Sequence, residues 1–184
     1  MSNDLTPILV TARELYGRVV YSHKVHEKER EIWSGKVCWM NRVNITLAGI
    51  TTIFAVISAS LKPLWALVVT AISAAASVSF AIWQASADPA AKEAQHRVAA
   101  KEMLWIREQL LLFIGSCQAQ TPRPDAQRQL DLLTRELTAV YKFAPDTSPE
   151  AYAAAEKMLK SGHFTFSDDE IDGFLPMDLR KKKP

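Results

Sequence analysis

The sequence predicts an all-α fold, in which a two-helix hairpin integral to a membrane is extended by cytoplasmic helices and followed by a small C-terminal helical region. Three observations predict it. One stretch of the chain is almost free of charge, basic residues gather on both sides of it, and the other segments repeat apolar residues at helical spacing. The averages hide this pattern, since a formal net charge of +2 and a mean hydropathy of -0.04 are typical of a soluble protein.

The charge-free stretch covers residues 43–87. Of the 22 basic and 20 acidic residues in the chain, only Lys62 lies within it. A hydrocarbon core about 30 Å thick is crossed by about 20 mainly apolar helical residues, and a helix satisfies its own backbone hydrogen bonds there. We therefore predict two spans, at about 43–61 and 64–84. The alternative, a soluble bundle with a buried hairpin, would need more protein to cover two helices that are apolar all round.

The junction between the spans predicts a tight turn. Lys62 precedes Pro63 and so avoids the helical conformation, while proline suits the first position of the second span. Trp39, Trp65 and Trp83 lie near the ends of the spans, where indole rings prefer the membrane boundary.

Basic flanks predict the orientation of the hairpin. Five basic residues lie within about 20 residues before the charge-poor stretch and four lie within about 20 residues after it, whereas the turn has only Lys62. The flanking residues are Lys24, Lys28, Arg30, Lys36 and Arg42, then Lys92, Arg97, Lys101 and Arg107. Because basic residues stay on the cytoplasmic side, we expect both termini there.

Two cytoplasmic arms flank the hairpin, at 1–42 and 88–116. Thr6-Pro7 predicts the start of the first helix, with Thr6 as its cap. Asp88-Pro89 predicts a break and a restart capped by Asp88. The helix that follows is expected to run to about Phe113 and to be ended by Gly115 and the stretch Thr121-Pro-Arg-Pro124. Its expected packing residues are Ala94, Val98, Leu104, Ile106, Leu110 and Phe113. In the first arm, we expect a solvated face of mixed charge formed by Lys24, Glu27, Lys28, Glu29, Arg30 and Glu31.

The C-terminal region, 125–184, predicts three further helices. The first covers about 125–143, with Leu130, Leu133, Leu137 and Val140 at heptad-like spacing. The second runs from Thr147-Ser-Pro149 to about Gly162. Ser167 to Glu170 fits a capping box for a short helix over 168–174, and a basic tail over 180–183 is expected to be solvated.

No catalytic motif is present in the sequence, so we expect no enzyme activity, no cofactor and no metal. His23, His26 and Glu27 lie on adjacent helix faces and could begin a metal site. Two histidines three residues apart, without a clear third and fourth ligand, favour structural hydrogen bonding instead. A near-neutral charge also argues against direct binding of nucleic acid.

Each span carries a face of small and polar residues at steps of three or four. Such faces allow close helix approach and hydrogen bonds across helices in lipid. Spacing alone favours packing, within the hairpin or between subunits, while the alternative is a stripe that lines water when several hairpins assemble. A single hairpin encloses no channel, so a pore requires a homo-oligomer. The candidate residues for either role are Asn44, Thr51, Ser58, Thr70, Ser73, Ser77 and Gln84.

Two short motifs resemble a known family. The arm residues Tyr21-Ser22-His23-Lys24-Val25-His26-Glu27-Lys28, followed by the spans, resemble the SLATT family, the SMODS and SLOG-associating two-transmembrane effectors. The segment from Asp169 to Pro176, with Leu179-Arg180, is similar to that family's terminal motif.

The resemblance implies an effector from bacterial anti-phage conflict systems that permeabilises the inner membrane. It also implies a separate sensor or nucleotide-signalling protein as partner. We expect Tyr21, His23, His26 and Glu27 to be arm contacts without a catalytic role.

Overall fold

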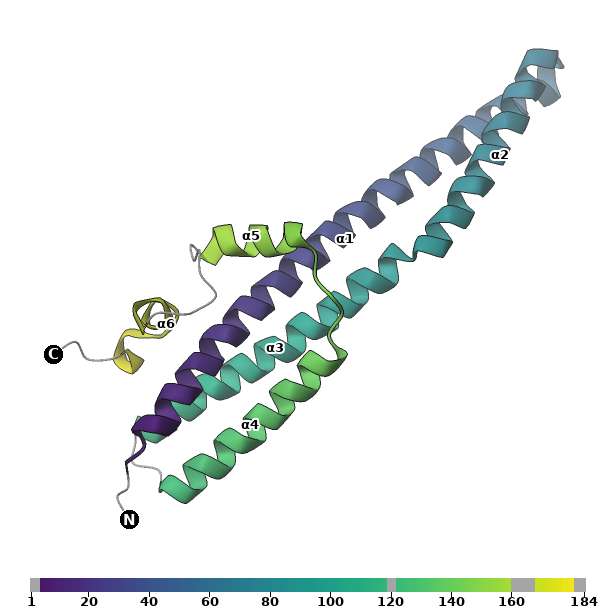
Figure 1. Cartoon of the computed structure of the whole chain (residues 1–184). Coiled ribbons are helices and arrows are strands. Elements are labelled where there is room, and N and C mark those ends of the chain that lie inside the picture. The colour runs from purple at the N-terminus through teal and green to yellow at the C-terminus, as the bar shows by residue number, and fades with distance from the viewer. Residues whose placement is uncertain (1–3, 119–121, 160–167, 181–184) are drawn as a thin grey trace. The chain divides into compact units, whose positions relative to one another are not determined.

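The structure is a computed structural model that describes residues 4–118, 122–159 and 168–180, and it is all-α over these ranges, as predicted. The elements, labelled in Figure 1 where there is room, are α1 (Thr6–Leu61), α2 (Leu64–Ala87), α3 (Pro89–Gln118), α4 (Arg123–Phe143), α5 (Pro149–Leu159), α6 (Asp168–Phe174) and a 3-10 turn, Met177–Leu179. Two compact units are present. We call residues 31–93 the hairpin unit and residues 1–30 with 94–184 the core unit.

The first arm and the first predicted span form one helix, α1. It passes through Gly35 without a break and ends at Leu61. Thr6 is its first residue and not its cap, because the side chain of Asp4 accepts a hydrogen bond of 3.0 Å from the Thr6 amide.

Two residues with left-handed backbone conformation, each followed by proline, separate α1 from α2 and α2 from α3. Lys62 has φ 54° and Asp88 has φ 39°. The turn prediction at Lys62 is confirmed, although Pro63 precedes the first helical residue of α2 by one position. Asp88 ends α2 with an amide bond to Gln84 and starts α3, since its Oδ1 accepts a 3.1 Å bond from the Ala91 amide. The predicted cap is therefore confirmed.

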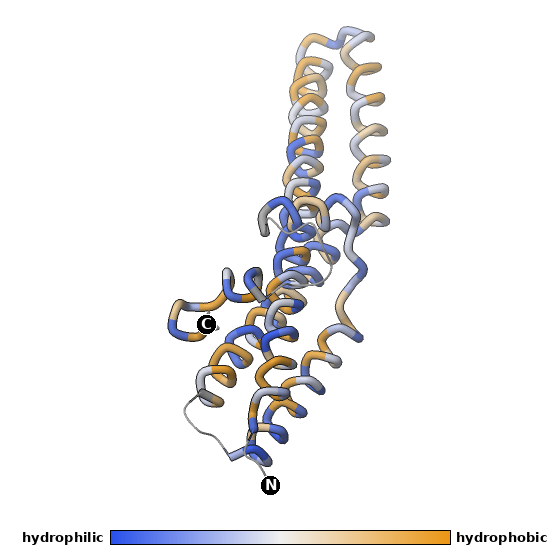
Figure 2. Tube along the Cα trace, turned by 60° about the vertical axis from the view of Figure 1, so that its left-hand side comes forward, coloured by the Kyte–Doolittle hydropathy of each residue, from blue (hydrophilic) through white to orange (hydrophobic). Residues whose placement is uncertain are grey.

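The hairpin unit presents apolar side chains outward. In the single chain, no residue of the most apolar 18-residue stretch of α1 is buried. In the corresponding stretch of the helical segment that begins at Leu64, 11% of the residues are buried. Ile45 is 72% exposed and Leu64 is 75% exposed. Figure 2 shows hydrophobic residues around the hairpin and few hydrophilic ones. A core helix of a soluble protein would be mostly buried, so the exposed apolar surface favours the membrane interpretation.

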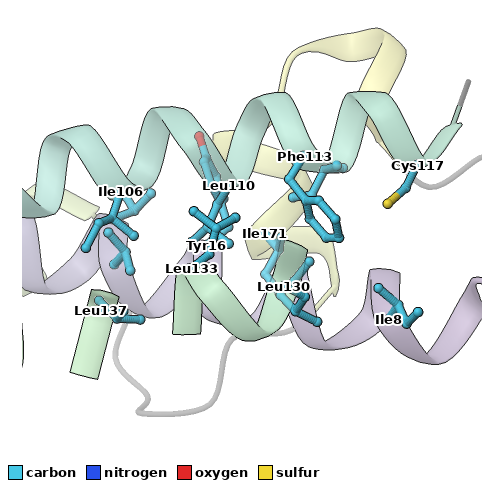
Figure 3. Packing of buried hydrophobic residues seen from close by; sticks show 14 of the residues in the cluster. Ile8, Tyr16, Ile106, Leu110, Phe113, Cys117, Leu130, Leu133, Leu137 and Ile171 are labelled. Carbon is cyan, nitrogen blue, oxygen red and sulfur yellow. The ribbon is translucent and has the colours of Figure 1, made fainter. Parts of the chain in front are cut away.

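The core unit packs α1, α3 and α4 around one apolar core, closed by α6 (Figure 3). Each helix contributes a stripe at steps of three or four, which turns one face inward. Figure 3 shows side chains from all four helices converging there. The buried residues of the stripes include Ile8, Ala12, Tyr16 and Val19 on α1, Met103, Ile106, Leu110 and Phe113 on α3, and Leu130, Leu133 and Leu137 on α4.

Several expectations about α3 are wrong. Helix α3 passes through Gly115, because one glycine weakens a helix by only about 1 kcal/mol and the nearby Ile114 and Cys117 remain buried. It ends at Gln118, ahead of the stretch 121–124 that is also expected to end it. Ala94, Val98 and Leu104 are exposed, since the stripe that enters the core lies on another side of the helix.

The remaining C-terminal expectations are borne out within a few residues. Helix α4 starts two residues earlier than predicted, α5 starts at Pro149, and α6 has the predicted bounds. The predicted end near Gly162, the Ser167 member of the capping box and the tail beyond Arg180 lie outside the described residues.

The core predicts a contrast between two leucines of α3. Leu110 is 1% exposed and Leu112 is 67% exposed. We expect Leu110→Ala to lower the free energy of unfolding by about 2–5 kcal/mol, because it leaves a cavity. Leu112→Ala is the matched control and should change it by less than about 0.5 kcal/mol. Denaturant unfolding of the detergent-solubilised chain, followed by circular dichroism, measures both, and equal effects would contradict this packing.

Candidate functional site

Polar side chains meet inside the hairpin unit near the open end of the hairpin. The Asn44 side-chain amide donates to Gln84 Oε1, and Gln84 Nε2 donates to Asn41 Oδ1 over 3.2 Å. These contacts join α1 to α2 and satisfy groups that would be costly to leave unpaired in hydrocarbon.

A second polar contact lies further along the hairpin. The Thr51 hydroxyl hydrogen-bonds Ser73 Oγ over 2.9 Å, and Ser73 is only 8% exposed. Ala66, on the same helix, is fully buried. Small residues thus let the helices approach closely where the hydroxyls meet.

The other candidates on the span faces do not form such pairs. The Thr70 hydroxyl donates to the Ala66 carbonyl of its own helix over 2.8 Å. Ser58 is half-buried near the turn. Ser77 Oγ is buried and has no hydrogen-bond partner within the described part of the chain.

Aromatic residues mark both ends of the hairpin unit. Trp39 packs on Phe80 with ring centroids 6.0 Å apart, and Phe54 packs on Trp65 at 5.9 Å. Trp33 lies beside two ammonium groups, with Lys36 Nζ 3.9 Å and Lys92 Nζ 4.6 Å from its ring centroid. Amphipathic and basic side chains at these levels suit the boundary between lipid and water.

The arm motif builds a second site, in the core unit, around a pair of buried histidines. His26 on α1 and His96 on α3 lie with their Nδ1 atoms 3.1 Å apart, and they are 6% and 3% exposed. One ring must donate and the other accept, so the pair requires complementary tautomers. Burial lowers the pKa of His26 to about 4, and the neighbouring His96 lowers it further. Burial also lowers the pKa of His96. Both rings are therefore neutral at pH 7.

Glu29 is buried beside this pair, which corrects the prediction that it belongs to a solvated face. It is 4% exposed, and its Oε2 accepts bonds from the Ser148 amide at 2.8 Å and the Ser148 hydroxyl at 2.6 Å. Ser148 immediately precedes α5, and its Oγ accepts a bond from the Ala151 amide. The carboxylate thus lies at the positive end of a helix, which offsets part of the cost of its burial.

The other residues of the arm motif have varied contacts. His23 Nε2 lies 3.7 Å from Glu27 Oε1, while Lys24 bonds Glu27 over 2.6 Å. Burial lowers the pKa of His23. Tyr21 packs on Tyr152 of α5 with ring centroids 5.2 Å apart.

At this motif, His26 forms a hydrogen-bonded pair with His96. Within the described ranges, no group of three or more His, Cys, Asp or Glu residues is placed to hold a metal ion. The sequence interpretation missed His96 and Glu29. His96 could have been found, because it lies at helical spacing from the buried residues Ala99, Met103 and Ile106. No local signal separates Glu29 from its exposed neighbour Glu31.

The terminal motif docks on the first turns of α1. Arg13, only 6% exposed, forms an ion pair with Asp172 and donates to the Leu179 carbonyl over 3.1 Å. The Tyr16 hydroxyl donates to the Phe174 carbonyl over 3.1 Å. The C-terminal segment is therefore held by side-chain bonds to its backbone as well as by the core.

Comparison with known protein families finds a match over most of the chain. Residues 9–170 of the 184 match SMODS and SLOG-associating 2TM effector domain family 4. No curated protein and no solved structure matches the chain.

Glu29 provides a stability test against its neighbour. We expect Glu29→Ala to lower the free energy of unfolding by about 1–3 kcal/mol, because the Ser148 amide and hydroxyl lose their buried acceptor. Glu31→Ala, at an exposed position of the same helix, is the control and should have a much smaller effect. Denaturant unfolding in detergent measures both. A similar loss in the two variants would mean that Glu29 does not hold α5.

The histidine pair predicts a stability that depends on pH. Both rings have a lowered pKa in the folded state, so the unfolded chain takes up protons at a higher pH than the native chain does. Stability is complete above the unfolded pKa of about 6.5 and declines as the pH falls towards 4. Each histidine contributes a decline of up to about 1.4 kcal/mol per pH unit while it stays neutral.

Thermal unfolding between pH 7 and pH 5 measures this decline. The double variant H26Q/H96Q keeps amides that can hydrogen-bond but removes both titrating groups. Its melting temperature should depend less on pH than that of the parent. The same dependence in parent and variant would exclude the histidine pair as its source.

Proposed function

Because this chain belongs to SMODS and SLOG-associating 2TM effector domain family 4, we propose that it is a membrane effector of a bacterial anti-phage conflict system. It oligomerises and permeabilises the inner membrane when a sensor partner or ligand triggers it. It acts by making the membrane permeable and not by catalysis, so it has no substrate.

The observation that carries this proposal is the polar line within an otherwise apolar hairpin. Asn44 with Gln84 and Thr51 with Ser73 form it, together with Ser77, whose hydroxyl has no partner in the described part of the chain. Polar groups at membrane depth are costly in lipid and often line water-filled pathways.

The present pairing within one hairpin is compatible with a later opening. Hydrogen bonds between helices in a membrane contribute only about 0.6 kcal/mol each on average. A rearranged assembly could exchange them for bonds to water or to a neighbouring subunit at small cost. The closed state of the effector is then the hairpin described above, and the open state exposes the same polar groups to water.

The orientation and partners follow from the charge pattern and the family. Both termini are cytoplasmic, since nine basic residues flank the spans against one in the turn. A homo-oligomer is required, because two helices enclose no channel. The trigger comes from a separate sensor or nucleotide-signalling protein, and no direct contact with nucleic acid is involved.

A second candidate is a non-conducting membrane anchor whose core unit recruits a soluble partner. The pairing of Asn44 with Gln84 and of Thr51 with Ser73 favours it, because paired groups serve the packing of the hairpin without further assembly. The two functions differ in whether the polar face must become accessible to water.

Dye release from liposomes distinguishes these functions. The purified chain is reconstituted in vesicles that contain a self-quenched dye. We expect dye release when the proteins encoded by its neighbouring genes are added. The triple variant T70L/S73L/S77L should lose most of this release, because bulky apolar side chains fill the polar face. The matched control I72L/V78L/I82L, at three exposed positions of the same helix, should retain it.

Partner recruitment is measured in the same experiment by cross-linking the chain to the proteins encoded by the neighbouring genes and recovering the cross-linked product. Retained partner recruitment by the T70L/S73L/S77L variant, with no dye release from the parent chain despite verified insertion, would support the anchor and exclude the effector. Equal loss of release in the polar-face variant and the control would show that the polar face is not specifically required.

A further inference from the structure

A cavity of about 310 Å³ lies against the arm motif in the core unit. Its walls come from two stretches far apart in the sequence, residues 21–26 and 141–152. Tyr21 and His26 belong to α1, Tyr141 belongs to α4, and Tyr152 belongs to α5, while Asp146 lies in the connection between the last two helices. Neither the family nor the proposed membrane activity assigns a role to this cavity.

Three tyrosine rings form much of the wall. Tyr21 and Tyr152 pack at a centroid distance of 5.2 Å with an interplanar angle of 53°. The Tyr141 hydroxyl lies 3.1 Å from Ser22 Oγ, which ties that ring to α1. The faces of aromatic rings carry partial negative charge, so several rings around one space attract a cation.

The charge of the wall has the same sign preference. Asp146 is the charged residue among the described residues that line the cavity, and no lysine or arginine lines it. His26 adds no positive charge at pH 7, because burial lowers its pKa to about 4. Arg18 is close enough to affect Tyr141, but its guanidinium is paired with Glu14. A phosphate group would therefore lack the basic partners that normally bind it.

We propose that this cavity binds a small organic cation, an amine or a quaternary ammonium. The tyrosine rings contact its alkyl groups and attract its positive charge electrostatically, and Asp146 supplies the negative counter-charge. The volume lies at the lower end of the range of ligand sites, which suits a compact ligand. An occupied site would link α1, the α4–α5 connection and α5 through one molecule.

Isothermal titration of the full chain in detergent tests the proposal, with tetramethylammonium and choline as probes. We expect saturable binding of at least one probe. Asp146→Asn and Tyr152→Leu should each weaken the binding about tenfold, since each removes one source of cation attraction. Asp178→Asn, an exposed carboxylate outside the cavity, is the matched control and should bind like the parent.

Three results would overturn the proposal. The first is no saturable binding of either probe up to tens of millimolar. The second is an unchanged affinity in Asp146→Asn, whose exposed position leaves the fold intact, with the melting temperature as the check. The third is binding of inorganic phosphate or AMP that the Tyr152→Leu variant weakens, since it would assign the cavity to anions. None of these measurements involves membrane permeability, so the proposed effector function can fail or hold independently.

Discussion

The structure depends on the exposure of the apolar side chains of the hairpin. Apolar side chains of α1 and α2 point outward, and water would make that exposure costly over some fourteen large side chains, from Trp39 to Trp83. Lipid removes this cost but supplies no hydrogen bonds, so polar groups of the spans must find partners within protein or water. The polar faces of the two helices therefore turn towards each other, and Asn44 meets Gln84 as Thr51 meets Ser73. Lipid thus explains both the apolar outer surface of the hairpin unit and the paired polar groups between its helices.

The core unit meets a different constraint and meets it with different side chains. Its helices bury ordinary apolar stripes, yet they also bury ionisable groups, among them Arg13, His26, Glu29 and His96. Each of these four has a specific partner, because an unpaired buried charge or polar group is costly. Arg13 is paired with Asp172 in the terminal motif, and Glu29 bonds the start of α5. These bonds fix which segments dock on α1, whereas apolar contacts alone would tolerate several arrangements.

The sequence alone predicted much of the fold and less of the site. The charge-free stretch located both apolar helices, and the proline junctions located their ends, because hydrophobicity and backbone restriction are local properties. The role of Glu29 was not predictable in this way, since its partner Ser148 lies 119 residues away and its neighbours Lys28 and Arg30 are charged as well. Val98 shows the same limit, because apolar character alone did not reveal which side of α3 enters the core. His96 was within reach, since helical spacing from Met103 places it on the buried side.

A trigger must act where two arrangements differ in free energy, because a ligand that binds both equally shifts neither. The hydrogen bonds inside the hairpin contribute little to its stability, so they oppose a rearrangement of the two helices only weakly. The contacts of the core unit are stronger and more specific: a buried ion pair, a carboxylate at a helix start, and a histidine pair that needs complementary tautomers. The first two hold the terminal motif and the start of α5 on α1, and the third joins α1 to α3. In the proposed effector, the contacts that a trigger must change are therefore those of the core unit.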